Sequence, residues 1–196
     1  LDFGKADFKN IGLETAINLK LNRIASEYGL VLQQQDSANK LEELILKLSQ
    51  EKKVAILIDE YDKPIIEYLG ETELKHAQEN RAILKQFYSV IKGLDAHIHF
   101  FFLTGVSKFS KVSIFSDLNH LEDITMSPQT HALVGYTQTE LEHYFTTEID
   151  DLAEKEKVSR LEMIEKIKRW YNGYCWDAEE ETLYNSFSVL HLMKQK

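Results

Sequence analysis

The chain has 196 residues, 43% of them hydrophobic, which is enough apolar material for a globular core. Its formal net charge of −9 argues against a broad surface for binding nucleic acid, although a local basic patch is compatible with that total. The one cysteine, Cys175, excludes an internal disulfide and fits a reducing compartment such as the cytoplasm.

The sequence shows no sign of membrane insertion or export. No apolar run approaches the roughly 18 residues that a membrane-spanning helix needs, and no basic-then-apolar leader is present. We therefore expect a soluble cytoplasmic protein. Residue 1 is leucine rather than methionine, so we interpret the chain as a piece of a longer protein.

The first elements are predicted to be a strand end and two packing helices. Residues 1–3 are interpreted as the end of a strand. Over residues 10–28, and again over 38–50, apolar residues recur at three- and four-residue spacing, which is typical of amphipathic helices; Gly29 ends the first.

Five apolar residues, 54–58, run directly into the adjacent carboxylates Asp59 and Glu60. Such a run is typical of a strand buried in a parallel sheet, and ligands of open α/β sheets bind outside the carboxyl ends of the strands. In phosphate-transferring ATPases the first acid holds Mg²⁺ and the second orients or deprotonates the attacking water. The alternative is that the two acids only end the strand, with Pro64 at the first position of the next helix.

A helical crossover then leads to a second buried strand. Residues 64–69 are predicted as a helical turn, residues 73–92 as a long helix and residues 98–103 as the strand. A strand, a helical crossover and another strand form the βαβ unit of a parallel sheet. We therefore expect the two strands to be parallel, adjacent and central, with both acids and Thr104 at one cleft.

His97 and His99 do not predict a metal site. The two-residue period of a strand places them on one face, but no third ligand is placed by spacing.

The remaining residues predict one more strand and then helices. Residues 121–126 are interpreted as a third core strand, after which Pro128 breaks regular structure. Capping boxes at Thr137 and Ser159 begin two helices, so we expect a helical region over residues 137–196 after an α/β core over residues 1–136. The aromatic cluster of residues 170–174 lies at a helix end, where packing is favoured over stacking on a base.

Five segments carry a resemblance to a known family. In chain order they are IDEYDKP (58–64), FFLTGVSKFSKVSIFSDLNHLEDIT (101–125), GYTQTELEHYF (135–145), WYNGY (170–174) and YNSFSVL (184–190). Together they resemble the bacterial AAA-ATPase-like family over nearly the whole chain. Two departures stand out: the glycines here form no phosphate loop of the Gly-Lys-Ser/Thr type, with which the family opens, and Ser186 occupies an expected proline position.

The resemblance implies a three-layer α/β fold of the P-loop NTPase type, truncated at its start, with a C-terminal part that resembles a lid or winged-type appendage. It also implies ATP hydrolysis with Mg²⁺ in the intact parent. There Asp59, in the Walker B strand, would hold Mg²⁺, Glu60 would be the catalytic base, and Thr104 or Ser107 would be the sensor of the terminal phosphate.

Two lysines beyond the second strand are candidates for binding the nucleotide. Lys108 and Lys111 would place positive charge against a phosphate. The alternative, which we favour slightly for the lysines, is that both are solvated and that Thr104 and Ser107 cap a turn.

Two other functions are compatible with these patterns. One is a non-catalytic regulatory or interaction module that keeps the fold without turning over nucleotide. The other is a restriction-like nuclease, because family members often carry such a domain further along; here Glu60 and Lys63 have one residue too many between them for the acid-x-Lys arm of that site.

Overall fold

The structure is a computed structural model that describes residues 1–70, 72–106, 121–127, 129–175 and 182–194. It divides into two compact units, Leu1–Leu121 and Glu122–Lys196, each with its own hydrophobic core. The sequence pattern places this boundary after residue 136. In the structure Gly135 and Tyr136 belong to the second unit, because they pair with a strand near its end.

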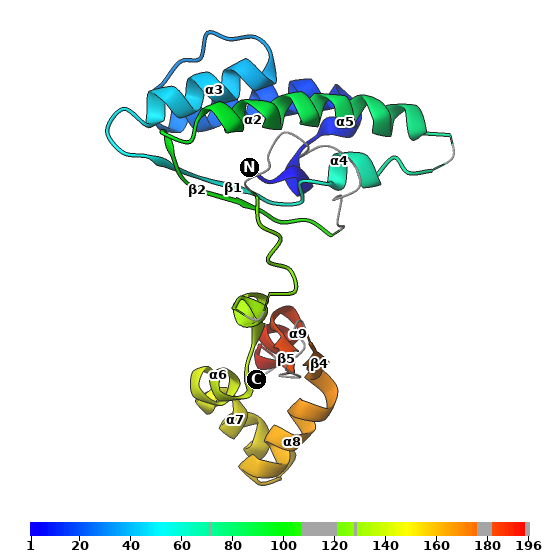
Figure 1. The fold of residues 1–196 in the computed structure, drawn as a ribbon. Helices are drawn as coiled ribbons and strands as arrows, with labels where there is room; N and C mark the ends of the chain where they lie inside the picture. The colour runs from blue at the N-terminus through cyan, green and yellow to red at the C-terminus, as the bar shows by residue number, and fades with distance from the viewer. Residues whose placement is uncertain (71, 107–120, 128, 176–181, 195–196) are drawn as a thin grey trace. The chain divides into compact units, whose positions relative to one another are not determined.

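The first unit is a mixed α/β domain, as predicted (Figure 1). Its elements are the 3-10 turn η1 (Phe3–Lys5), α1 (Phe8–Ile11), α2 (Leu13–Glu27), α3 (Ser37–Leu48), β1 (Val54–Ile58), α4 (Lys63–Ile66), α5 (Leu74–Ser89), the 3-10 turn η2 (Val90–Gly93) and β2 (Ile98–Leu103). The helices and strands predicted from apolar spacing in this unit are thereby confirmed, with ends that differ by a few residues.

The strands β1 and β2 are parallel and adjacent, which confirms the βαβ prediction. Ile58 pairs with Leu103, and the Thr104 N–H donates to the Ile58 carbonyl at 2.9 Å. Because the register aligns the two strand ends, the residue after each strand emerges at the same edge of the sheet.

The first three residues lie along the other side of β1. The Asp59 N–H donates to the Leu1 carbonyl at 2.8 Å, and the Phe3 N–H donates to the Asp59 carbonyl at 3.0 Å. These bonds form a single parallel bridge between Asp2 and Asp59, after which the chain turns into η1. Among the described residues the sheet has two strands, β1 and β2, and this bridge adds a neighbour only at the end of β1, so the central position of the two strands stays a prediction.

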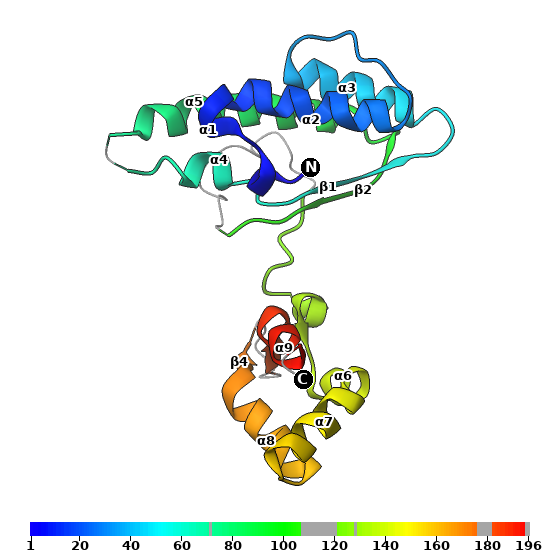
Figure 2. The ribbon, with the colours of Figure 1, turned by 180° about the vertical axis from the view of Figure 1, so that it is seen from behind.

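Helices cover one face of the β1–β2 pair. α2, α3 and α5 lie together on that face (Figures 1 and 2) and bury an apolar cluster that includes Leu21, Leu84 and Phe87. On the opposite face Leu57 is 57% exposed and Phe100 is 51% exposed, so no described element of this unit covers it. The described residues therefore form two layers, and the predicted third layer stays a prediction.

The prediction of a third core strand over residues 121–126 is wrong, since the structure has no strand there. Local hydrogen bonds take the place of a strand ladder. The Asp123 carboxylate accepts from the Thr125 N–H at 3.0 Å, and the Thr130 hydroxyl donates to the Ile124 carbonyl at 2.8 Å. Side chains of this kind compete with sheet pairing by satisfying nearby backbone groups.

The second unit contains more than the predicted helices. Its elements are η4 (His131–Val134), β3 (Gly135–Tyr136), α6 (Gln138–Tyr144), α7 (Thr146–Glu156), α8 (Arg160–Tyr171), β4 (Asn172–Tyr174), β5 (Leu183–Asn185) and α9 (Ser186–Met193). The strands form a small antiparallel sheet in the order β3-β5-β4, which corrects the expectation of helices alone.

Both predicted capping boxes are confirmed, at Thr137 for α6 and at Ser159 for α8. Ser186 stands at the first position of α9, where proline is also favourable, and its hydroxyl donates to the Val134 carbonyl at 2.8 Å. Among the residues described, no helix combines the length and apolar character needed to cross a membrane.

Candidate functional site

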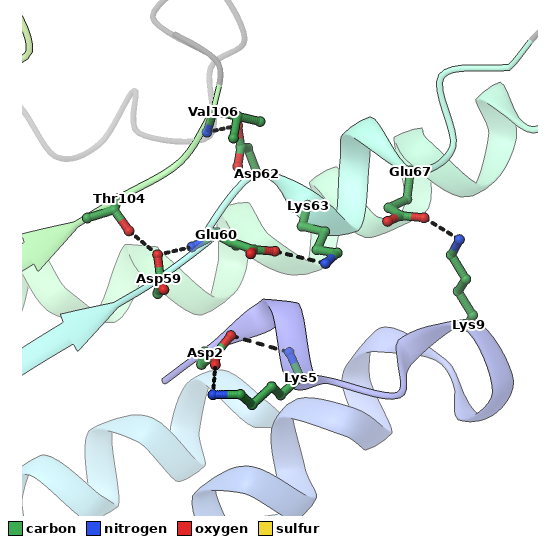
Figure 3. A network of polar contacts seen from close by, with 10 residues as sticks. All are labelled: Asp2, Lys5, Lys9, Asp59, Glu60, Asp62, Lys63, Glu67, Thr104 and Val106. Atoms are coloured by element: carbon green, nitrogen blue, oxygen red, sulfur yellow. Dashed lines mark hydrogen bonds and ion pairs between the residues drawn. The ribbon is translucent and has the colours of Figure 1, made fainter. Parts of the chain in front are cut away.

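The candidate site lies at the carboxyl ends of β1 and β2. Asp59 directly follows β1 and Thr104 directly follows β2, and the Thr104 hydroxyl donates a hydrogen bond to Asp59 Oδ1 (Figure 3). The same oxygen accepts from the Glu60 N–H at 3.0 Å. The geometry therefore brings together three residues that the sequence singled out from two separate segments.

Asp59 is held by its backbone and presents an exposed side chain. Its N–H and carbonyl are both bonded to residues 1–3, and its Oδ1 is oriented by Thr104. A fixed, solvent-accessible carboxylate with a neighbouring hydroxyl offers the hard oxygen ligands that Mg²⁺ prefers.

Glu60 has an unusual backbone conformation. Its φ is 52°, in the left-handed region, which it shares only with Lys157 among the non-glycine residues described. A residue without glycine's freedom pays about 1–2 kcal/mol for this conformation. Residues with such strained backbones cluster at active sites, ligand clamps and switch regions.

The Glu60 carboxylate contacts two residues that the sequence did not assign to the ATPase site, Lys63 and Gly4. Lys63 Nζ lies 2.9 Å from Glu60 Oε2, and this hydrogen bond raises the pKa of Lys63. Gly4 lies on the other side, so close that a Cβ there would be 2.7 Å from Glu60 Oε2. Glu60 and Lys63 lie on one tight turn before α4, in which the Lys63 N–H donates to the Glu60 carbonyl at 3.1 Å, whereas no local pattern predicts the contact with Gly4.

Three predicted site residues cannot be compared with this geometry. Ser107, Lys108 and Lys111 lie outside the described residues. His97 is engaged structurally, since its Nδ1 is 2.7 Å from the Ser49 hydroxyl oxygen. Within the part of the chain that the structure describes, no group of three or more metal-ligating His, Cys, Asp or Glu side chains occurs.

Comparison with known proteins places this site within a matched region. Residues 1–115 match a family described as "Predicted AAA-ATPase". An "uncharacterized protein in vnfD 5'region" from Azotobacter chroococcum mcd 1 is 44% identical over 145 residues, which cover 74% of this chain and 25% of that protein. The chain thus spans about a quarter of the length of this relative. No solved structure gives a significant match.

Proposed function

The chain belongs to the predicted AAA-ATPase family, and on that premise we propose that the β1–β2 edge is the carboxylate part of an ATP-hydrolysing site in the full-length protein. The observation that carries the proposal is the hydrogen bond from Thr104 to Asp59, which joins the ends of two adjacent parallel strands. Nucleotides bind at this edge of open α/β sheets.

Each described residue has a distinct role in the proposed site. Asp59 holds Mg²⁺ in the manner of a Walker B acid, and Thr104 orients Asp59 and senses the terminal phosphate. Glu60 orients the attacking water and accepts its proton. Bound Mg²⁺ would neutralise charge on the phosphates. Ser107, Lys108 and Lys111 complete the proposal as a further sensor and as phosphate-binding charges.

The proposal requires a phosphate loop from another part of the full-length protein. Carboxylates alone repel a polyanion, whereas backbone N–H groups and a lysine in such a loop bind the β- and γ-phosphates. The proposed complete domain is a three-layer P-loop NTPase fold, and the exposed apolar face around Leu57 and Phe100 is consistent with a further layer.

Calorimetric titration with ATP and Mg²⁺ tests whether ATP binding needs a phosphate loop from outside residues 1–196. We expect the full-length protein to bind ATP and residues 1–196 to bind it weakly or not at all. Micromolar affinity of residues 1–196 would contradict the proposal and would indicate a phosphate site within this chain. Binding by the full-length protein without any phosphate release would instead favour the regulatory module.

Gly4→Ala tests whether the observed position of Glu60 is its working position. We expect roughly tenfold slower ATP hydrolysis by the full-length protein, because the new Cβ must displace the Glu60 carboxylate. The backbone of Gly4 lies outside the left-handed region, so its conformation suits alanine, and thermal stability should change little once the Glu60 carboxylate has moved. Steady-state phosphate release and thermal unfolding measure the two effects.

Gly93→Ala is the matched control for this change. A Cβ at Gly93 meets no atom within 4 Å, and its backbone also lies outside the left-handed region. The control should hydrolyse ATP at the parental rate. If Gly4→Ala does the same, the Glu60 carboxylate works from another position than the one observed.

A further inference from the structure

Asp62 is a buried acid that the proposed chemistry does not use. Its residue exposure is 0%, and it occupies the N-cap position of α4. An aspartate at this position ordinarily accepts a hydrogen bond from the first turn of its own helix. The Asp62 side chain makes no such capping bond.

The Asp62 carboxylate reaches across to the segment that leaves β2. Its Oδ2 accepts from the Val106 N–H at 3.0 Å (Figure 3). Gly105 passes so close that a Cβ there would lie 2.8 Å from Asp62 Oδ1 and 2.6 Å from the Tyr61 ring. The absence of a side chain at Gly105 therefore permits this approach.

Two backbone hydrogen bonds also join the ends of β1 and β2. The Thr104 N–H donates to the Ile58 carbonyl at 2.9 Å, and the Tyr61 N–H donates to the Thr104 carbonyl at 3.0 Å. Those two bonds use backbone groups that any sequence carries. The bond from Val106 to Asp62 depends on one side chain, and it lies on the far side of Thr104 from the strand.

We propose that Asp62 is a positioning residue, whose buried carboxylate holds the Thr104–Val106 segment against the end of β1 and so keeps the Thr104 hydroxyl beside Asp59. The effect on catalysis rests on the proposed ATPase function. Asp62 acts through Thr104 and Asp59, and it is assigned no contact with nucleotide. A loss of Asp62 is therefore expected to reduce kcat more than it changes KM for ATP.

The first measurement is amide hydrogen exchange of the full-length protein, which needs no activity. Asp62→Ala removes the acceptor, so the Val106 amide should exchange at least about tenfold faster while the amides of β1 and β2 stay protected. Asp62→Asn keeps an oxygen that can accept from Val106 and should stay near the parental exchange rate. Unchanged exchange at Val106 in Asp62→Ala would overturn the proposal.

The second measurement is steady-state ATP hydrolysis by the same variants. We expect Asp62→Ala to lower kcat roughly tenfold with KM within about twofold, and Asp62→Asn to recover most of the loss. Faster exchange at Val106 with parental kcat would show that the contact exists but does not position the site, which would overturn the proposal. If the parental protein releases no phosphate, the proposed function fails while the exchange result still decides the contact.

Asp62→Leu is a second variant without the acceptor, to be used if Asp62→Ala does not fold. Leucine branches at Cγ as aspartate does and, although it is larger, it fills the buried space with an uncharged side chain that has no acceptor for Val106. It should reproduce the exchange and kcat effects of Asp62→Ala. Parental exchange at Val106 in a folded Asp62→Leu protein would overturn the proposal.

Discussion

Glu60→Gln is expected to lower the rate of ATP hydrolysis by the full-length protein by roughly 10²-fold or more, while ATP binding persists. Glutamine keeps the size of the side chain and an oxygen that can accept from Lys63, but it cannot take the proton of the attacking water. Steady-state phosphate release and a calorimetric titration with ATP measure the two quantities.

A neighbouring glutamate provides the matched control. Glu67 forms an ion pair with Lys9 close to the candidate site (Figure 3), so Glu67→Gln makes the same chemical change in a similar pair. It should leave the hydrolysis rate near the parental value. A parental rate in Glu60→Gln would show that Glu60 is not the base, and the non-catalytic module would then be the better account.

Asp59→Asn is expected to weaken the Mg²⁺-dependent part of ATP binding by at least about tenfold, since this carboxylate acts through the metal and not on the water. Asparagine keeps an oxygen that can accept from the Thr104 hydroxyl and from the Glu60 N–H, so the strand ends should stay joined. Titration with ATP in the presence and absence of Mg²⁺ measures the metal-dependent part.

The two substitutions must therefore differ. Glu60→Gln should bind ATP with a parental Mg²⁺ dependence, and Asp59→Asn should not. An equal Mg²⁺ dependence of binding in the Asp59→Asn and parental proteins would remove Asp59 from the proposed metal site and leave only its structural contact with Thr104.

The sequence predicts those elements of the first unit that have long apolar patterns. The apolar runs of β1 and β2 and the helix between them are long enough to indicate a parallel βαβ unit, and this unit alone brings Asp59 and Thr104 to one edge. The capping boxes at Thr137 and Ser159 are equally local signals, because both partners lie within one helical turn.

The parts that sequence reasoning missed depend on contacts between distant residues or on very short elements. β3, β4 and β5 have only two or three residues each, which is too short for the two-residue period of a strand to be visible. The close approach of Gly4 to Glu60 joins separate segments, and the left-handed φ of Glu60 follows from the turn that the folded chain makes there.

The contact of Asp62 with Val106 also joins residues that are distant in the sequence, so the sequence alone does not predict it. The structure places Asp62 at the N-cap of α4, where an aspartate ordinarily caps its own helix. Only the folded register of β1 and β2 reveals that the Val106 N–H lies within its reach.

The most direct measurement is the anomalous scattering of Mn²⁺ in crystals of the full-length protein with a non-hydrolysable ATP analogue. The account predicts an anomalous peak beside the Asp59 carboxylate, at about 2.1 Å or one water molecule away, with the γ-phosphate facing Glu60 and Thr104. A metal ion and nucleotide bound away from the β1–β2 edge would contradict it.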